Sequence, residues 1–480
     1  MPATPSTARA INDRLALGLL QQEGPLTAGR LKQLTGLSRP TVADLVDRLT
    51  AAGLITVVGE SGEQRRGPNA RLYGIVAGRA HLAALDVRTG GVVVLVSDLL
   101  GQVLAEESVP IGGDAGTGTA VEQAVAAVER TAKEAGADRL HTVGIGAPGL
   151  IDPVTGELRD SAGLPAWHRS LATALQERLP GARVTVENET NLAAVAEQRE
   201  GAARDRDTFV LLWLGHGVGA AVVLDGTLRR GASGGTGEIG FLPVPGTDSL
   251  PSARDCDGGF HALTGAAALT SLAIRCGLPA PPATDGAGAA AVVRGAVAEV
   301  TGEAGTADTG RTAAVGAPEG PCGPTASPRA GAPGPAGAVA SPGAGAGSAG
   351  AGPAGAAAAG TPAGGAGAVA GDGTAAQRLA DTGSPSLRFL RLLADRVAVG
   401  VASVVAVLDP GCVVLGGEVG QAGGAVLAGL VEERLRALSP LRTEVRASSL
   451  GGAAVLRGAL LTARDRAQDE LFAPPERPAP

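Results

Sequence analysis

The chain has 480 residues, is 44% hydrophobic but only 2% aromatic, and carries a formal net charge of −7. This length suits two or three domains, and the acidic balance argues against a protein that binds polyanions over its whole surface. No apolar run approaches the roughly 20 residues of a membrane helix, and no basic segment precedes an apolar core at the N-terminus. We therefore expect a cytoplasmic protein without a membrane partner.

The charge is unevenly distributed along the chain. Residues 1–78 hold nine Lys and Arg against six Asp and Glu, whereas the rest of the chain holds 31 against 41. This change of sign favours a DNA-facing N-terminal part on an acidic body. The cysteines have no paired spacing, which predicts free thiols. They are Cys256, Cys276, Cys322 and Cys412.

Residues 1–76 are expected to form a winged helix-turn-helix domain. Ile11, Leu15 and Leu19 are spaced four residues apart, which predicts that they line one face of a first helix. Thr27 is positioned to cap a short second helix, and Gly36 supplies the turn that follows it.

A third helix is expected to complete the motif. Ser38 is a favourable N-cap, Pro40 falls in the first turn, and Gly53 ends the helix. Two wing strands are expected at 54–58 and 71–75. The core face of the third helix is formed by Val42, Leu45, Val46 and Leu49.

The other face of this helix is expected to contact DNA, because a helix-turn-helix inserts the N-terminal part of its second helix into the major groove. Arg39 and Thr41 lie at that end, and Arg65 and Arg66 lie at the tip of the wing, within reach of phosphate. The alternative is a small helical domain that binds protein and never touches DNA. The candidate DNA-contacting residues are Ser38, Arg39, Thr41, Arg48, Arg65 and Arg66.

Beyond residue 80 the pattern becomes that of an α/β protein with two lobes in tandem. Alternating and continuous apolar runs predict strands, and longer periodic runs predict helices. The expected strands are 81–87, 91–98, 102–109, 142–146, 184–187, 209–214, 218–224 and 413–415. The expected helices are 120–135, one that begins at Thr190, and 390–408.

Four motifs in this body resemble signatures of the ROK family of repressors and sugar kinases. They are Gly-Ile-Gly-Ala-Pro-Gly-Leu-Ile-Asp-Pro at 144–153, the Glu-Asn-Glu-Thr-Asn run within 186–194, Gly-Glu-Ile-Gly at 237–240, and the run that ends in Gly-Gly at 409–417. The resemblance implies an actin-like, hexokinase-type fold. Its two lobes are expected at 80–202 and 206–470. Members include sugar kinases and regulators of the xylose-repressor and N-acetylglucosamine-repressor type.

The resemblance also implies two phosphate-binding loops, and both depart from the kinase pattern. Asp86 begins the first loop, but Arg88 stands where a glycine would let the backbone approach ATP phosphates. A second loop contains Gly215 and Gly217, although a tight turn between strands explains such a loop equally well. We therefore expect ATP not to be a cofactor. The degenerate phosphate-loop residues are Asp86, Gly215, Gly217, Gly416 and Gly417.

The residues that would hold a sugar are better preserved. The resemblance assigns sugar contacts to Asn188, Glu189 and Glu238. Glu189 stands where family kinases have the Asp that accepts the hydroxyl proton, so the carboxylate lies one methylene further out and no catalytic residue is assigned. Asn188 and Glu189 also suit the cap and first turn of a helix, and the two roles are compatible.

The zinc segment of the family is also altered. Cys256 and His261 supply two of the four ligands that a closed tetrahedral zinc site needs, so no metal is expected. Phe241 replaces a histidine, and we expect Phe241 and Phe260 to pack in the vacated space.

Residues 283–380 are rich in Gly, Ala and Pro and have few large apolar side chains. Such a segment gains too little from burial to offset the entropy of ordering, so we expect a disordered insertion in the second lobe. Ala289 to Val300 is compatible with a short helix.

These departures together favour sensing over catalysis. We expect a DNA-binding transcription regulator, a repressor of carbohydrate genes, whose body binds a sugar or sugar phosphate. Its expected partners are double-stranded operator DNA and a second or further copies of itself, as a homodimer or homotetramer. The alternatives are an ATP-dependent sugar kinase with an appended DNA-binding head, and a scaffold that binds neither ligand nor DNA.

Overall fold

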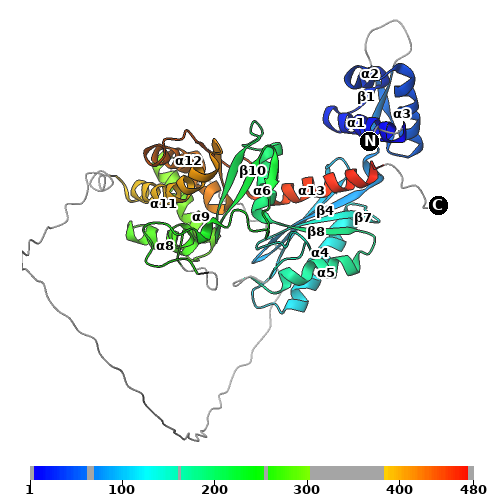
Figure 1. The fold of residues 1–480 in the computed structure, drawn as a ribbon. Coiled ribbons are helices and arrows are strands. Elements are labelled where there is room, and N and C mark those ends of the chain that lie inside the picture. Colours follow the sequence, from blue (N-terminus) through cyan, green and yellow to red (C-terminus); the bar gives the residue numbers. More distant parts are fainter. Residues whose placement is uncertain (1–4, 62–69, 160–163, 253–257, 303–382, 474–480) are drawn as a thin grey trace, which may run out of the picture. The chain divides into compact units, whose positions relative to one another are not determined.

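A computed structural model describes residues 5–61, 70–159, 164–252, 258–302 and 383–473. The N-terminal elements form a winged helix-turn-helix, as predicted (Figure 1). In the sheet, β3 lies between β1 and β2 and pairs antiparallel with both. The elements of this head are α1 (Pro5–Glu23), β1 (Leu26–Thr27), α2 (Ala28–Thr35), α3 (Arg39–Ala51), β2 (Ile55–Ser61) and β3 (Ala70–Ile75).

The prediction for the buried face of α1 is wrong. Ile11 and Leu15 are 59% and 45% exposed, whereas Leu17 and Leu20 are buried. The helix carries two apolar stripes, and Ala16 at the centre of the second stripe is small enough to let that side approach the core closely. Periodicity detected an apolar stripe but did not reveal which one the neighbouring helices cover.

The first lobe is a five-stranded sheet in the order β6-β5-β4-β7-β8, with α4 and α5 among the helices that pack on it. The first three strands form the predicted antiparallel meander, and β7 and β8 are added in parallel. The elements are η1 (Ala77–Arg79), β4 (His81–Arg88), β5 (Gly91–Asp98), β6 (Val103–Pro110), α4 (Thr117–Glu134), β7 (Leu140–Ala147), α5 (Trp167–Arg178) and β8 (Arg183–Asn188).

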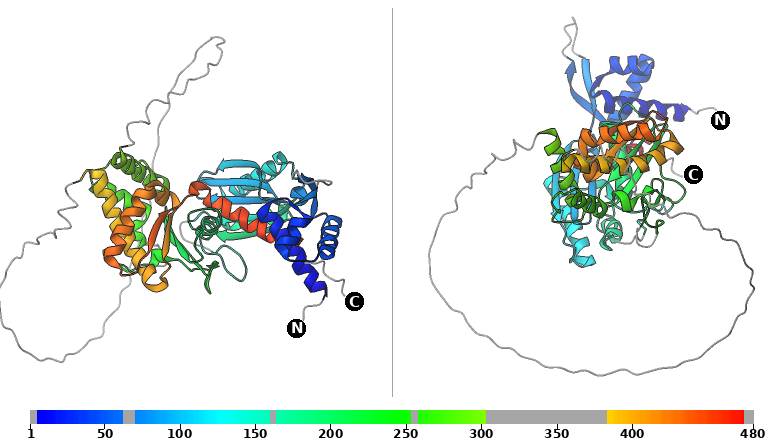
Figure 2. Two further views of the ribbon diagram at one scale, coloured as in Figure 1. Left: turned by 90° about the horizontal axis from the view of Figure 1, so that it is seen from above. Right: turned by 90° about the vertical axis from the view of Figure 1, so that its left-hand side faces the viewer.

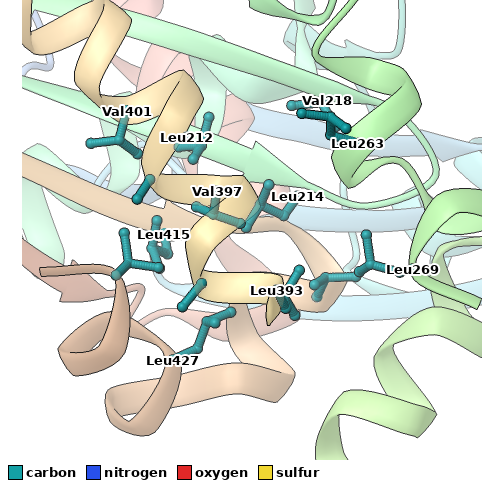
Figure 3. Packing of buried hydrophobic residues seen from close by; sticks show 14 of the residues in the cluster. Leu212, Leu214, Val218, Leu263, Leu269, Leu393, Val397, Val401, Leu415 and Leu427 are labelled. Atoms are coloured by element: carbon teal, nitrogen blue, oxygen red, sulfur yellow. The ribbon is translucent and has the colours of Figure 1, made fainter. Parts of the chain in front are cut away.

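The second lobe has a sheet in the order β11-β10-β9-β12-β13, and helices α8, α9, α11 and α12 share its core. Figure 3 shows this core, where leucines and valines of α11 meet those of β9 and β12. The elements are β9 (Phe209–Leu214), β10 (Val218–Leu224), β11 (Thr227–Arg229), η2 (Ile239–Phe241), α7 (His261–Thr264), α8 (Ala266–Arg275), α9 (Gly286–Thr301), α11 (Pro385–Leu408), β12 (Cys412–Gly416), α12 (Gly417–Leu438, kinked at Gly424) and β13 (Glu444–Ala447).

Helix α9 corrects the expected start of the insertion at residue 283. Asp285 caps this helix by accepting a hydrogen bond from the Gly288 amide at 2.8 Å. Val293 and Ala296 are buried in the core of the second lobe. The short helix expected at Ala289 to Val300 is therefore confirmed, and its small residues serve close packing rather than disorder. The remainder of the predicted insertion, from residue 303, lies outside the described residues up to 382.

Two helices run beside each other next to the first-lobe sheet: α6 (Glu189–Glu200) and the C-terminal α13 (Ala454–Leu471), which follows η4 (Gly451–Ala453). Their backbones come very close, because a Cβ placed on Gly458 would lie 2.0 Å from the carbonyl oxygen of Leu192. A Cβ on Gly144 would likewise lie 2.7 Å from the carbonyl oxygen of Ala459. Figure 2 shows α13 in red against the blue strands of the first lobe.

Within the described parts of the chain, we find no helix with the length and apolarity to span a bilayer.

Candidate functional site

The helix-turn-helix is built by local capping interactions. The hydroxyl of Thr27 accepts a hydrogen bond from the Arg30 amide at 3.1 Å, and Gly36 ends α2 in the left-handed region, with φ 68°. The hydroxyl of Ser38 then caps α3 by accepting from the Thr41 amide at 3.3 Å. The predicted caps and turn are therefore confirmed, and they orient the N-terminus of α3.

The candidate DNA-contacting residues have different environments. Ser38 and Arg39 are exposed at the start of α3. The Thr41 hydroxyl lies 2.8 Å from that of Ser38, so the two hydroxyls share a hydrogen bond. Arg65 and Arg66 lie outside the described residues, between β2 and β3.

Arg48 has partners within the head. Its guanidinium donates to Asp13 of α1 and to Asp44 one turn earlier on α3, and the Arg48 side chain is 30% exposed. The hydrogen bond to Asp13 is the main cause that raises the pKa of Arg48 above its ordinary value. Arg48 therefore joins α1 to α3, and we no longer propose it as a DNA contact.

The first phosphate-type loop of the body is closed by its own arginine. Arg88 donates from Nε to the Asp86 carboxylate at 2.8 Å and from a terminal nitrogen to the Gly452 carbonyl at 3.1 Å. Asp86 is buried, and burial raises the pKa of this carboxyl against the opposing effect of Arg88. Burial disfavours the charge of Arg88, but Asp86 and, less strongly, Glu418 raise the pKa of Arg88 overall.

Asn188 and Glu189 form the start of α6. The Asn188 side-chain oxygen accepts from the amides of Thr190 and Asn191 at 2.9 and 3.2 Å, so the helix-cap role is present. Its amide nitrogen donates to the Gly149 carbonyl at 3.1 Å and to the Glu189 carboxylate at 2.7 Å. Asn188 thus ties the loop of the first family-like motif to Glu189.

The carboxyl of Glu189 lies in an unfavourable place for a negative charge. The pKa of Glu189 is raised to about 8, chiefly by burial and in addition by the charges of Asp86, Glu238 and Glu418. Residues distant in sequence are therefore brought within electrostatic range of one another. At neutral pH this carboxyl is mostly protonated, and a protonated carboxyl does not suit a general base.

The predicted residues of the second lobe lie at the ends of strands or, in the case of Glu238, directly before η2. Glu238 is exposed to solvent yet partial burial raises the pKa of its carboxyl. The amide of Gly215 donates to the Gly217 carbonyl at 3.0 Å, which makes the tight turn that was the alternative interpretation of this loop. Gly417, with φ 74°, starts α12 directly against the Leu214 carbonyl of β9.

Glu418 was missed by the sequence interpretation. A Cβ on Gly215 would come within 2.3 Å of a Glu418 carboxylate oxygen, so this carboxylate lies against the second glycine-rich loop. A Cβ on Gly286 would lie 3.3 Å from the same carboxyl carbon and 2.8 Å from the His216 amide nitrogen. An acidic residue directly after the Gly-Gly pair was the available signal, because an anion at that place opposes a phosphate group.

His168 was also missed. Its ring is 4% exposed and meets Trp167 edge to face, with 4.3 Å between ring centroids. Burial lowers the pKa of His168 to about 4, and the nearby Arg88 backbone opposes this shift. Neither ring nitrogen reaches hydrogen-bonding geometry with the residues described. His168 is therefore a neutral core residue beneath the first loop.

The region of the family's zinc segment is described only in part. Cys256 lies outside the described residues, and those that are described contain no group of three or more metal ligands. Phe260 is fully buried against Gly400 of α11, as expected of an apolar filler. Phe241 is 37% exposed, so the prediction that it packs there is wrong. It is the last residue of the short η2.

A hollow of about 550 Å³ lies elsewhere, between the C-terminal ends of α4 and α5, and is lined by residues such as Lys133, Arg139 and Pro180. None of the candidate site residues lines it.

Comparisons with known proteins agree with this geometry. The model of the ROK family matches residues 83–276 and 372–466, and that of the MarR family matches residues 11–67. A solved ROK family transcriptional regulator, a homologue of the Escherichia coli MLC protein, superposes with a TM-score of 0.62 at 18% identity, covering 97% of this chain and 98% of that one. At this identity the likeness concerns the fold.

Curated relatives include regulators and a kinase. The chain is 25% identical over 253 residues to a xylose repressor of Caldicellulosiruptor bescii (51% of this chain, 61% of the relative), and 26% identical over 246 residues to the N-acetylglucosamine repressor of Escherichia coli O157:H7 (49% and 58%). It thus spans about three-fifths of each relative. A glucokinase of Thermotoga maritima is 39% identical over 102 residues (21% of this chain, 32% of the relative).

Proposed function

This chain belongs to the ROK family, and on that premise we propose that it is a DNA-binding transcription regulator, a repressor of carbohydrate genes, whose body senses a sugar. The observation that carries the proposal is the head. Helix α3 follows the Gly36 turn, is capped by Ser38, and presents Arg39 to solvent beside a two-stranded wing. That geometry suits insertion of the start of α3 into a major groove. The similarity to two repressors supports the same function.

The body supports sensing rather than phosphoryl transfer. Transfer from ATP needs space and cations for the phosphates, and a carboxylate that accepts a proton. Here Arg88 is held by Asp86, the Glu418 carboxylate lies against the second loop, and Glu189 is mostly protonated at neutral pH. Each of these three features disfavours one part of the kinase reaction.

The same charges bear on the class of sugar. Asp86, Glu238 and Glu418 lie within electrostatic range of the mostly protonated Glu189, and Arg88 is already neutralised by Asp86. A phosphate group would therefore meet more negative than positive charge. We propose a neutral or amino-bearing sugar as the effector and not a sugar phosphate, with Asn188, Glu189 and Glu238 as its contacts.

The regulator would act as a homodimer or homotetramer, because two heads must engage two half-sites about one helical turn, or a multiple of it, apart. A sugar that binds one arrangement of the lobes more tightly than the other would change operator occupancy.

An electrophoretic shift with DNA from upstream of the protein's own gene tests the DNA-binding function. Binding should weaken steeply as salt rises, since phosphate contacts release counterions. Folded protein that shifts no such DNA at low salt would contradict the proposal. Thermal unfolding with glucose and with glucose 6-phosphate forms a matched pair for the effector class, because a bound ligand stabilises the folded state. Stabilisation by the phosphate alone would contradict the proposed class.

The second candidate function is an ATP-dependent sugar kinase. The retained carboxylate of Glu189 and the similarity to a glucokinase over 102 residues favour it. Turnover of a hexose in a coupled ADP-release assay at roughly 1 per second or more would establish it.

A further inference from the structure

Glu197 is a fully buried carboxylate that accepts hydrogen bonds from two distant segments of the chain. From one side, the Ala202 amide donates at 2.6 Å. From the other, the Ser448 hydroxyl donates at 2.5 Å and the Leu450 amide at 3.2 Å. Ser449 adds its amide and hydroxyl at 3.4 and 3.3 Å. Such a carboxylate holds both segments in one fixed arrangement.

These two segments are the points where the chain passes between the lobes. The segment with Ala202 leads from α6 to β9, the central strand of the second sheet. The segment 448–450 leads from β13 of that sheet to η4 and α13, which packs on β4 and β7 of the first sheet. We call these two interlobe segments, at Ala202 and at 448–450, the crossings. Glu197 therefore joins both crossings, and a relative movement of the lobes must disturb its hydrogen bonds.

The crossing at 448–450 continues directly into η4 and α13, and this helix connects the candidate sugar site with the head. At the start of α13, the Gly452 carbonyl accepts from Arg88 at 3.1 Å. At its other end, Asp469 pairs with Arg14 of α1, and Gln468 donates to Gln21 of α1 at 3.0 Å. A helix of 18 residues is about 27 Å long, so α13 spans that separation as one rigid element. Figure 1 shows its red C-terminal end beside α1.

The helix has no room to slide independently of its neighbours. The close approach of Gly458 to Leu192 fixes α13 against α6, the helix that begins with Asn188 and Glu189 and contains Glu197. Arg199 of α6 adds a pair with Asp465 of α13 at 2.6 Å. A close-packed interface of this kind moves as a unit rather than deforming gradually.

We propose that Glu197 and helix α13 couple the candidate sugar site to the DNA-binding head: a change in the arrangement of the lobes alters the crossings held by Glu197 and is carried by α13 to α1. This coupling rests on the proposed function, since it concerns the sugar and DNA sites of the same molecule. The reciprocal effect follows, because DNA that holds the heads must then change sugar affinity by the same factor.

The first test needs neither sugar nor DNA. Hydrogen–deuterium exchange is compared among the full-length wild type, Glu197→Gln and the matched control Glu177→Gln, an exposed carboxylate on α5. The glutamine NH2 group replaces the oxygen that accepts from Ala202 and Ser449, so donors then face a donor and these hydrogen bonds are lost. We expect faster exchange at Ala202 and 449–450 and, far away, a several-fold rise in α1, with no change in the control. A rise confined to the two crossings would overturn the coupling.

A second variant acts at the opposite end of α13 and does not touch the buried network. Arg14 and Asp469 are each 60% exposed, so Asp469→Asn should leave the folded state intact. With xylose and N-acetylglucosamine as probes, the wild type should show a sugar-dependent change in DNA affinity of about 5- to 150-fold. Asp469→Asn should bring that factor toward one while thermal shift still reports sugar binding, and an unchanged factor would count against α13.

The two proposals fail in different ways. A wild type that shifts no DNA, or that binds neither probe, contradicts the proposed function, whereas the exchange experiment still decides whether α13 connects the crossings to α1. If Glu197→Gln does not fold, exchange in Asp469→Asn is decisive: α1 must become less protected than in the control, or the coupling is refuted.

Discussion

The guanidinium of Arg88 donates from Nε to the carboxylate of Asp86, two residues earlier in the chain, over 2.8 Å. This pair closes the loop in which the related kinases need open backbone for phosphates. It also connects the first lobe to the start of α13, because the same arginine donates to the Gly452 carbonyl.

Removing the arginine should cost stability without creating a kinase. In Arg88→Gly the buried Asp86 loses its cation, so we expect the free energy of unfolding to fall by about 1–3 kcal/mol. The double variant Asp86→Asn/Arg88→Gly should recover part of this loss, because a neutral amide needs no counter-charge. Urea unfolding measures both, and ADP release should stay at background. Hexose turnover by Arg88→Gly would show that only this side chain blocks catalysis.

The carboxyl of Glu189 predicts a pH dependence of stability. Its pKa is about 8 in the folded state against an ordinary value of 4.5, so the folded protein retains a proton that the unfolded chain loses. The stabilisation is complete below about pH 4.5 and is lost as the pH rises through about 8. Over that window the stabilisation from this carboxyl changes by a few kcal/mol, as an order of magnitude.

Glu189→Gln should flatten this profile, measured as Tm against pH, while Glu177→Gln should leave it unchanged. A smaller slope of the same sign should remain from Glu238, whose pKa is also raised by burial. An unchanged slope in Glu189→Gln would show that another group titrates in this window.

Substitution by alanine should affect DNA binding at one arginine of the head, Arg39, and stability at another, Arg48. Arg39→Ala removes an exposed side chain at the start of α3, so DNA binding should weaken by about 1–3 kcal/mol with little change in Tm. Arg48→Ala removes the pair with Asp13 between α1 and α3 and should lower stability by about 1 kcal/mol. Fluorescence anisotropy on DNA and thermal melts separate the two effects. A loss of DNA affinity in Arg48→Ala at unchanged stability would restore it as a DNA contact.

The packing of α13 on α6 can be tested with one matched pair of glycines. Gly458→Ala places a methyl group 2.0 Å from the Leu192 carbonyl oxygen, a backbone atom that has no room to retreat. We expect a loss of at least about 3 kcal/mol. Gly295→Ala lies in α9, where a Cβ meets no described atom within 4 Å, so it should stabilise by roughly 0.5–1 kcal/mol. Equal effects in denaturant unfolding would contradict the described contact between the helices.

The sequence by itself determined the elements whose signals are local. Thr27, Gly36 and Ser38 specify caps and a turn through bonds to residues at most four positions away, so the head was predictable. Alternating and continuous apolar runs likewise predicted most strands of both lobes, although not β11 or β13, and the family-like motifs predicted the fold. Site assignments from those motifs remain proposals that the experiments above decide.

Only the tertiary structure decided which surfaces meet. It chose the Leu17 stripe of α1 over the Ile11 stripe, and it placed α9 in the core despite a composition that suggested disorder. It brought Glu418 to the loop of Gly215, some two hundred positions earlier in the chain, and joined Glu197 to the segment 448–450. Such contacts depend on how packed elements approach one another, and the periodicity of a single element carries no information about its partner.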